Sequence, residues 1–197
     1  MILVYLIAIL LTGAFLAWIA GIRNPVWSRI ISLVALCIDF VLIIIYASQH
    51  GSPDDKWIVD FKLDWIPEFG ISLHLALDGL SLLLIILTFF LGIISVIISW
   101  KEINSKVGFF HFNLLTILAG IVGVFLSLDL FLFYFFWELM LVPMYFLIGI
   151  WGHENRTPAS NKFFLYTQAS GLLMLLSILG LYFVHGHATG QYTFDYI

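Results

Sequence analysis

The residue that most clearly points to chemistry is Glu138, the one carboxylate inside the apolar run 130–151. A charge at membrane depth is costly, so an acidic residue there is a functional candidate by default. Glu138 follows Asp129 by nine residues, about 13 Å along a ~30 Å membrane core, which predicts a position near mid-membrane. Pro143 removes a backbone hydrogen bond to Leu139 and is expected to kink or loosen this helix. A carboxylate beside such a break suits a proton or ion path; the alternative is a protonated side chain that joins two helices.

Two other titratable residues lie within apolar segments. Asp39 is in the middle of the second such segment, where it could be a second relay carboxylate or could face a neighbouring subunit. His111 is near one end of the fourth segment, where it could shuttle protons or simply be an interfacial polar residue.

Lys162 opens the sixth apolar segment. It is either an interfacial lysine whose ammonium group reaches water, or the inner mouth of a proton path. The path would continue through Thr167, Gln168 and Ser170, because residues three apart, such as Thr167 and Ser170, share a helix face.

Glu138 has no obvious basic partner, because no Lys or Arg lies in the middle of any apolar segment. The partner is therefore water, or it belongs to another subunit or to sequence beyond this chain. No His pair has ligand spacing within a segment, so we expect no metal or haem site, and the single Cys37 cannot form an internal disulfide.

The composition is that of an integral membrane protein. The chain is 62% hydrophobic and 10% charged, whereas soluble domains carry about 25% charged residues. It has no basic cluster, so nucleic acid is not an expected partner. The first residues have no basic region and no small-residue cleavage site, which predicts a retained membrane span and not a cleaved signal peptide.

A helix needs about 20 apolar residues to cross a ~30 Å core. The sequence predicts six spans, at residues 2–20, 30–47, 79–100, 109–126, 130–151 and 162–185. The run 110–150 is too long for one span, so we expect a tight turn near Asp129. Asp78 and Asp129 are suitable N-caps for the third and fifth spans. Residues 71–78 alternate between apolar and polar types, which predicts a short strand or hairpin in the longest loop.

The basic residues predict the orientation of the spans. With the N-terminus outside, the inner loops hold six basic residues, Arg23, Arg29, Lys101, Lys106, Arg156 and Lys162. The outer loops hold two, Lys56 and Lys62. Both termini are therefore expected to face outside.

Several long motifs resemble a known family. They are WELMLVPMYFL from Trp137, IWG from Ile150, KFFLYTQASG from Lys162, WIPEFGISLHLALDGLS from Trp65 and SWKE from Ser99. Together they resemble the antiporter-like membrane subunits of respiratory complex I, and among these the M-type subunits of NADH-quinone oxidoreductases, which correspond to mitochondrial subunit 4. The resemblance covers nearly the whole chain.

The resemblance implies an all-α polytopic helix bundle. The family has about fourteen spans with two inverted repeats, so the chain would be an N-terminal portion, with about six spans and an incomplete first repeat. Residues 1–47 would be two leading helices, 48–78 an outer loop, and 79–197 the start of the proton-translocating repeat. In the family, the Glu at the position of Glu138 pairs with a Lys on the seventh span, which would lie beyond residue 197.

The resemblance also implies a function. The intact subunit would translocate protons through Glu138 across a bacterial inner membrane, driven by quinone reduction in other subunits of complex I. Its partners would be those membrane subunits and the lipid bilayer. It would bind no NADH, flavin or iron–sulfur cluster, so no cofactor is expected. Two alternatives remain: a subunit of a multisubunit cation/proton antiporter, and a structural membrane module that does not pump.

Overall fold

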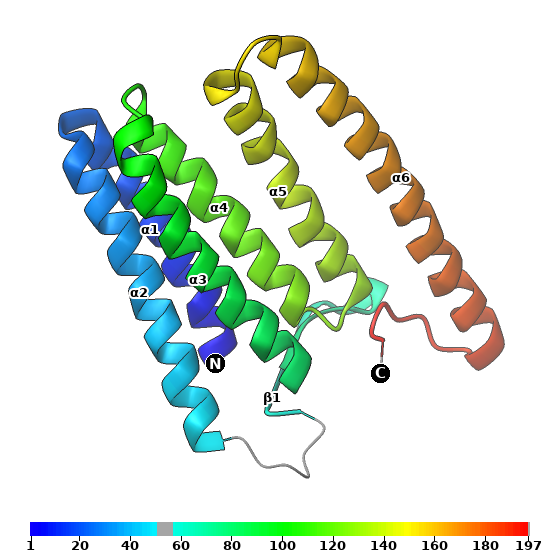
Figure 1. Ribbon diagram of the computed structural model, residues 1–197. Coiled ribbons are helices and arrows are strands. Elements are labelled where there is room, and N and C mark those ends of the chain that lie inside the picture. The colour runs from blue at the N-terminus through cyan, green and yellow to red at the C-terminus, as the bar shows by residue number, and fades with distance from the viewer. Residues whose placement is uncertain (51–56, 197) are drawn as a thin grey trace.

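The computed structural model of the chain describes residues 1–50 and 57–196. Within them it has six helices and one antiparallel two-stranded hairpin (Figure 1). The helices are α1 (Ile2–Arg23), α2 (Pro25–His50), α3 (Gly79–Glu102), α4 (Val107–Leu126), α5 (Leu130–Trp151) and α6 (Arg156–Thr189). The hairpin comprises β1 (Val59–Ile66), the 3-10 turn η1 (Pro67–Phe69) and β2 (Ile71–Leu77).

All six helices are long and apolar enough to cross a membrane, which confirms the predicted number of spans. Several helices extend beyond the predicted apolar limits. The largest difference is α6, which begins at Arg156 and has 34 residues, about 51 Å of helix against a ~30 Å core. The prediction counted apolar residues, but helical hydrogen bonding continues through polar residues once the chain has left the hydrocarbon.

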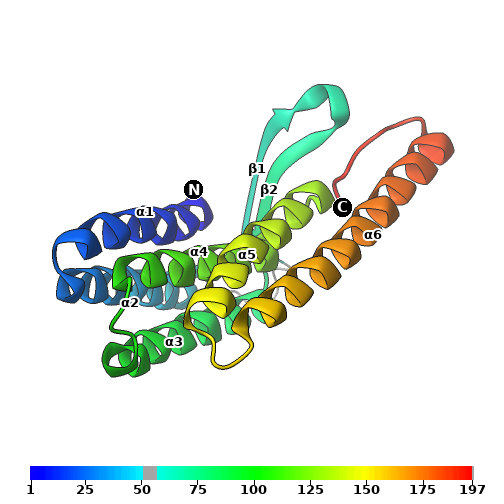
Figure 2. The same ribbon diagram turned by 90° about the horizontal axis from the view of Figure 1, so that it is seen from above.

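Helix α4 is the centre of the molecule. It packs against α1, α2 and α3 on one side and against α5 on the other (Figures 1 and 2). In the most apolar stretch of α4, 61% of the residues are buried, whereas in that of α6 only 17% are buried. The structure is therefore a four-helix bundle, α1–α4, followed by α5 and then by a peripheral α6.

Glycines let the helices approach closely at two contacts. A Cβ on Gly21 of α1 would collide with the backbone of Gly108 of α4. A Cβ on Gly120 or Gly123 of α4 would collide with side chains of α5. Without a hydrophobic driving force between helices in lipid, such small residues allow the backbone contact that holds helices together.

The predicted hairpin is present and lies at one end of the bundle, here called the hairpin end. Its two strands pair from Val59 with Leu77 to Ile66 with Ile71. The backbone of β2 also bridges to Ser127 in the α4–α5 turn, and Asp129 bridges to Asp195 in the C-terminal segment. The hairpin thus ties the start of α5 to the segment that follows α6.

The opposite end of the bundle, here called the basic end, carries the α1–α2, α3–α4 and α5–α6 connections (top of Figure 1). All six basic residues assigned to the inner loops lie in or beside these connections. Met1 and residue 196 both lie at the hairpin end, together with Lys62. Lys56 is outside the described residues.

Candidate functional site

The position of Glu138 is set by the cap of its helix. Asp129 is the N-cap of α5, as predicted, and its Oδ1 accepts hydrogen bonds from the backbone N–H groups of Phe131 and Leu132 at 2.9 and 3.1 Å. Its Oδ2 accepts from the N–H and the hydroxyl of Ser72 at 2.8 and 3.2 Å. Asp129 is fully buried. Counted from this fixed start, Glu138 is the ninth residue of α5, about 12 Å along the helix.

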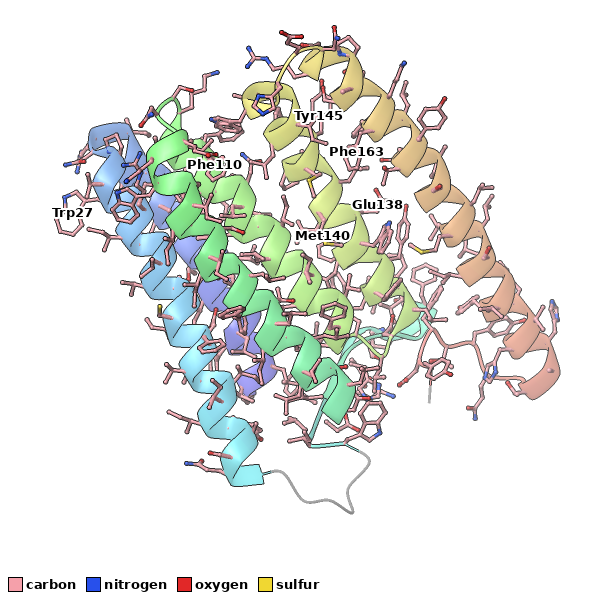
Figure 3. All side chains as sticks on the ribbon, in the orientation of Figure 1. Trp27, Phe110, Glu138, Met140, Tyr145 and Phe163 are labelled. Carbon is pink, nitrogen blue, oxygen red and sulfur yellow. The ribbon has the colours of Figure 1, made fainter. Side chains whose placement is uncertain are left out.

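The rotation of α5 directs Glu138 away from the four-helix bundle. Phe136 and Met140 pack into the space left by Gly123 and Gly120 of α4. Because residues two apart lie on nearly opposite faces of a helix, Glu138 faces the other way, towards α6. Figure 3 shows Glu138 between α5 and α6, with Met140 on the α4 side.

The carboxylate of Glu138 meets a glycine on α6. A Cβ on Gly171 would collide with Glu138 Oε1, so the absence of a side chain at 171 makes room for the carboxylate. The hydroxyl of Tyr134, one turn earlier on α5, lies near the Glu138 carboxylate and interacts with it electrostatically. Glu138 itself is half-buried, so it sits at the surface of the α5–α6 pair and not in a sealed core.

Pro143 lies inside α5 and is buried, and the helix continues on both sides of it. Pro143 therefore does not end the helix. Because proline has no N–H, the carbonyl of Leu139 still lacks its usual helical donor. This carbonyl lies one residue after Glu138.

The face of α6 that packs on α5 carries polar residues between Glu138 and the basic end. Ser160 lies against Gly149, and Tyr145 donates a hydrogen bond from its hydroxyl to Asn161 at 3.2 Å. Thr167, one turn before Gly171, is half-buried on the same face. Gln168 is half-buried and Ser170 is exposed.

Lys162 does not reach this face. It precedes Gly171 by nine residues, about two and a half turns, so it lies on the opposite side of α6. Its side chain is exposed. The structure therefore does not bring Lys162 to the Glu138 carboxylate.

His111 and Asp39 lie on the other side of α4. His111 precedes Gly120 by nine residues, so it faces the interior of the α1–α4 bundle, where it is 1% exposed. Close packing of α4 covers the ring, so it is exposed neither to lipid nor to water around the bundle. Asp39 is 0% exposed, so the alternative that it faces a neighbouring subunit is wrong. These two residues share an interior that Glu138 does not enter.

The ion pairs among the described residues are all at the hairpin end. His74, buried on β2, bridges Asp60 through Nε2 and Asp195 through Nδ1, each at 2.9 Å. Lys62 donates to the same Asp195 oxygen. This hydrogen bond is the largest cause of the raised pKa of Lys62. Glu138 takes part in no ion pair within residues 1–50 and 57–196.

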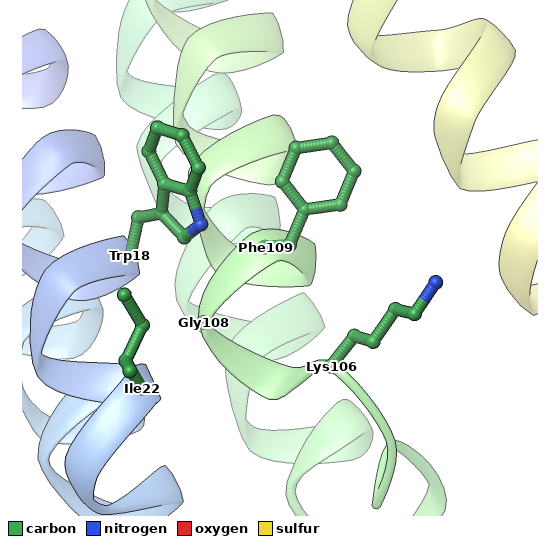
Figure 4. A pocket seen from close by; sticks show the side chains of 6 residues that line it. Trp18, Ile22, Lys106, Gly108 and Phe109 are labelled. Carbon is green, nitrogen blue, oxygen red and sulfur yellow. The ribbon is translucent and has the colours of Figure 1, made fainter.

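A pocket of about 340 Å³ opens at the basic end between α1 and α4 (Figure 4). Trp18 and Ile22 line it from α1, and Phe109 from α4. Lys106, just before α4, also lines it. The pocket holds none of the candidate proton-carrying residues, so it is not the functional site.

Sequence reasoning missed the two residues that contact the Glu138 carboxylate. Tyr134 could have been found because it precedes Glu138 by four residues on the same helix face. Gly171 stood out in the sequence only as the last residue of the motif that begins at Lys162. Its contact with Glu138 depends on how α5 and α6 pack, which no local pattern shows.

Comparisons with known proteins agree with this architecture. Residues 127–197 match the family model described as "NADH:quinone oxidoreductase/Mrp antiporter, TM". The chain is 50% identical over 207 residues to NADH-quinone oxidoreductase subunit M of Escherichia coli K12, covering 100% of this chain and 41% of that protein. The chain thus spans less than half the length of this curated relative.

Solved structures share the fold. A chain of respiratory complex I from Thermus thermophilus aligns with a TM-score of 0.76 at 22% identity, covering 96% of this chain and 38% of that one. A chain of the Mrp complex from Dietzia sp. DQ12-45-1b aligns with a TM-score of 0.77 at 20% identity, covering 98% and 20%. Over the length that it spans, the chain belongs to the family of antiporter-like membrane subunits of respiratory complex I that includes NADH-quinone oxidoreductase subunit M.

Proposed function

We propose that the chain contributes the leading helices of a proton-translocating membrane subunit of an NADH-quinone oxidoreductase, with Glu138 as its proton-carrying group. The observation that carries the proposal is the carboxylate near the middle of α5, turned towards α6 and accommodated by Gly171. Tyr134 contacts the carboxylate, and no cation pairs with it among the described residues.

Such a carboxylate can act as one half of an electrostatic switch. An approaching cation favours the ionised form of a carboxyl group, and withdrawal of the cation favours proton uptake. Because α6 is peripheral and its outer face is apolar and exposed, further membrane helices would cover the α5–α6 side and supply that cation. The chain's partners would then be other membrane subunits of the complex and lipid.

The remaining parts of the proposal follow from family membership and charge distribution. The protein would lie in a bacterial inner membrane with its basic end towards the cytoplasm, as the positive-inside rule requires. Electron transfer from NADH to quinone would take place in other subunits, and this chain would bind no cofactor.

The test is the substitution Glu138→Gln in the intact complex, which keeps the side-chain shape and removes the titratable group. Proton translocation during NADH oxidation should fall sharply, because the residue can no longer alternate between charged and neutral forms. The matched control is Glu68→Gln, since Glu68 is an exposed carboxylate at the hairpin end. Normal proton pumping by the Glu138 variant would refute the role.

A second candidate is a subunit of a multisubunit cation/proton antiporter. Two observations favour it: the matching family description names both classes, and the fold aligns with the Mrp complex. Sodium-dependent proton exchange in membranes that lack NADH oxidation would support the antiporter and exclude the respiratory assignment.

A further inference from the structure

Asp39 is a buried carboxyl group that the Glu138 route does not use. It lies about 21 Å along α2 from Pro25, close to the middle of the helix. Its side chain is 0% exposed. Neither carboxyl oxygen has a hydrogen-bond partner on the described protein.

The rotation of α2 directs Asp39 into the centre of the α1–α4 bundle. Ala35 packs against Gly13 of α1, and Leu36 packs against Gly92 of α3. Asp39 follows these residues by four and three positions, so it lies between them on the helix surface. Its side chain therefore points between α1 and α3, where α4 closes the bundle.

An ionised carboxylate without a partner is very costly in such a place, whereas a neutral carboxylic acid can be satisfied by a bound water. The two protonation states differ by one proton and by no covalent rearrangement. The position is thus suited to holding a proton.

Polar groups lead from the basic end towards Asp39. Ser28 and Ser32 are fully buried and lie on the same face of α2 as Asp39, eleven and seven residues before it. His111 continues the stripe of α4 formed by Leu115 and Leu118, which faces the same interior.

Several of the polar groups near the basic end lack hydrogen-bond partners. Ser28 Oγ and both ring nitrogens of His111 are buried without a hydrogen-bond partner among the described residues. Arg29 is 9% exposed and donates to the carbonyl of Ile103 at 2.9 Å, while its Nε has no such partner. Its charge acts on the His111 ring. Unpaired donors and acceptors of this kind bind internal water.

We propose that Asp39 is a second proton-binding site, a neutral carboxylic acid at the centre of the α1–α4 bundle that exchanges its proton with the basic end through His111. In the exchange, the O–H bond of Asp39 breaks and an N–H bond forms on the imidazole through bound water. The imidazolium then releases a proton at the basic end, and a proton returns from that end to the carboxylate by the reverse steps, which restores the neutral acid with no transfer of electrons. Ser32 is about 10 Å from Asp39 along α2, with Leu36 between them, so the exchange is slow.

This site is independent of the proposed role of Glu138. Helix α2 packs on α1, α3 and α4, whereas Glu138 lies between α5 and α6. Failure of one proposal therefore leaves the other standing.

The test is infrared spectroscopy of the intact complex as it is transferred from H₂O to D₂O. We expect a neutral carboxylic C=O band that shifts slowly after transfer, is missing in Asp39→Asn and remains in Glu138→Gln. In His111→Leu the band should remain, and its shift should be slowed several-fold. His111→Gln, which keeps a polar side chain of similar size, should also slow it, so the test does not depend on how the leucine variant packs.

The matched control is Asn113→Leu. Asn113 is 1% exposed on α4, hydrogen-bonded to the carbonyl of Phe109 in its own helix, and it points away from the face that carries His111. This variant should leave the rate of the shift unchanged. A spectrum in which Asp39→Asn loses no band would overturn the proton-binding site. An unaltered rate in both His111 variants would overturn the route.

Discussion

At the scale of single residues, the site depends both on the Glu138 carboxylate and on the lack of a side chain at Gly171. Glu138 can turn towards α6 because Gly171 leaves room for its carboxylate. Tyr134 contacts the same carboxylate from its own helix. The direction of the carboxylate is therefore controlled by α6, and a small change on α6 should alter proton transfer without touching a titratable group.

The substitution Gly171→Ala tests this control. The added methyl group meets Glu138 Oε1, so the carboxylate must rotate away and proton translocation in the intact complex should fall several-fold. Gly180→Ala is the control, because a Cβ at Gly180 has no neighbour within 4 Å. Both substitutions gain about 1 kcal/mol of helix propensity, so their difference reports the contact. Equal pumping by the two variants would contradict the interpretation.

At the scale of elements, α5 is held at a fixed register and rotation. Asp129 caps it and also bonds the hairpin, while Phe136 fits against the Gly123 surface of α4. The register sets the depth of Glu138 and the rotation sets its direction. The cap at Asp78 is simpler, with a single hydrogen bond from the N–H of Ser81 at 2.7 Å. The pKa of Asp78 is lowered chiefly by the side chain of Ser81, and the backbone N–H of Ser81 adds to this effect.

Replacing Asp129 by Ala should destabilise the subunit by about 2–3 kcal/mol, because it removes the α5 cap and leaves buried donors of Phe131, Leu132 and Ser72 unpaired. Asp78→Ala, at a half-buried cap, should cost about 1 kcal/mol. The measurement is the temperature at which the intact complex loses activity. Asp129→Asn keeps an acceptor oxygen and should recover part of the loss. If the two alanine variants were equally stable, the double role of Asp129 would be excluded.

At the scale of the whole molecule, the hairpin connects elements that are far apart in sequence. His74 and Lys62 both bind Asp195, and backbone bonds join Phe194 to Gly70 and Tyr196 to Leu128. These contacts, here called the latch, hold the segment after α6 against the start of α5. The latch therefore closes the α5–α6 pair at the hairpin end, with Glu138 between the two helices.

The substitution Lys62→Met should loosen the latch and speed hydrogen exchange at the amides of Phe194 and Tyr196 in the intact complex. The pKa of Lys62 is raised in the folded protein, chiefly by Asp195. Its contribution to stability is therefore fully present at neutral pH and is lost only as pH rises through the raised value. Lys62→Arg keeps the ion pair and should exchange at the wild-type rate. Unchanged exchange in the methionine variant at pH 7 would show that the pair does not hold the segment.

Much of the architecture was predictable from local patterns. The six spans, the turn at Asp129, the two Asp caps and the hairpin all follow from runs of apolar residues, capping residue types and alternation, which act over a few positions. The lengths of α2 and α6 were underestimated because apolar counting stops where the hydrocarbon stops. The site was only partly predictable: Glu138 was identified by its residue type and depth, but Gly171 and Tyr134 were not assigned to it.

By itself, the sequence determined that the chain has six helices able to cross a membrane, that its basic residues gather at one end, and that Glu138 lies near the middle of its helix. Each of these depends on hydropathy, charge or helical rise, which are properties of residues and their spacing. Only the tertiary structure decided which way each polar side chain points. Helix rotation is set by close packing at glycines such as Gly120 and Gly171. That packing directs Glu138 towards α6, leaves Lys162 on the far side of α6, and encloses Asp39 and His111 in a different bundle interior.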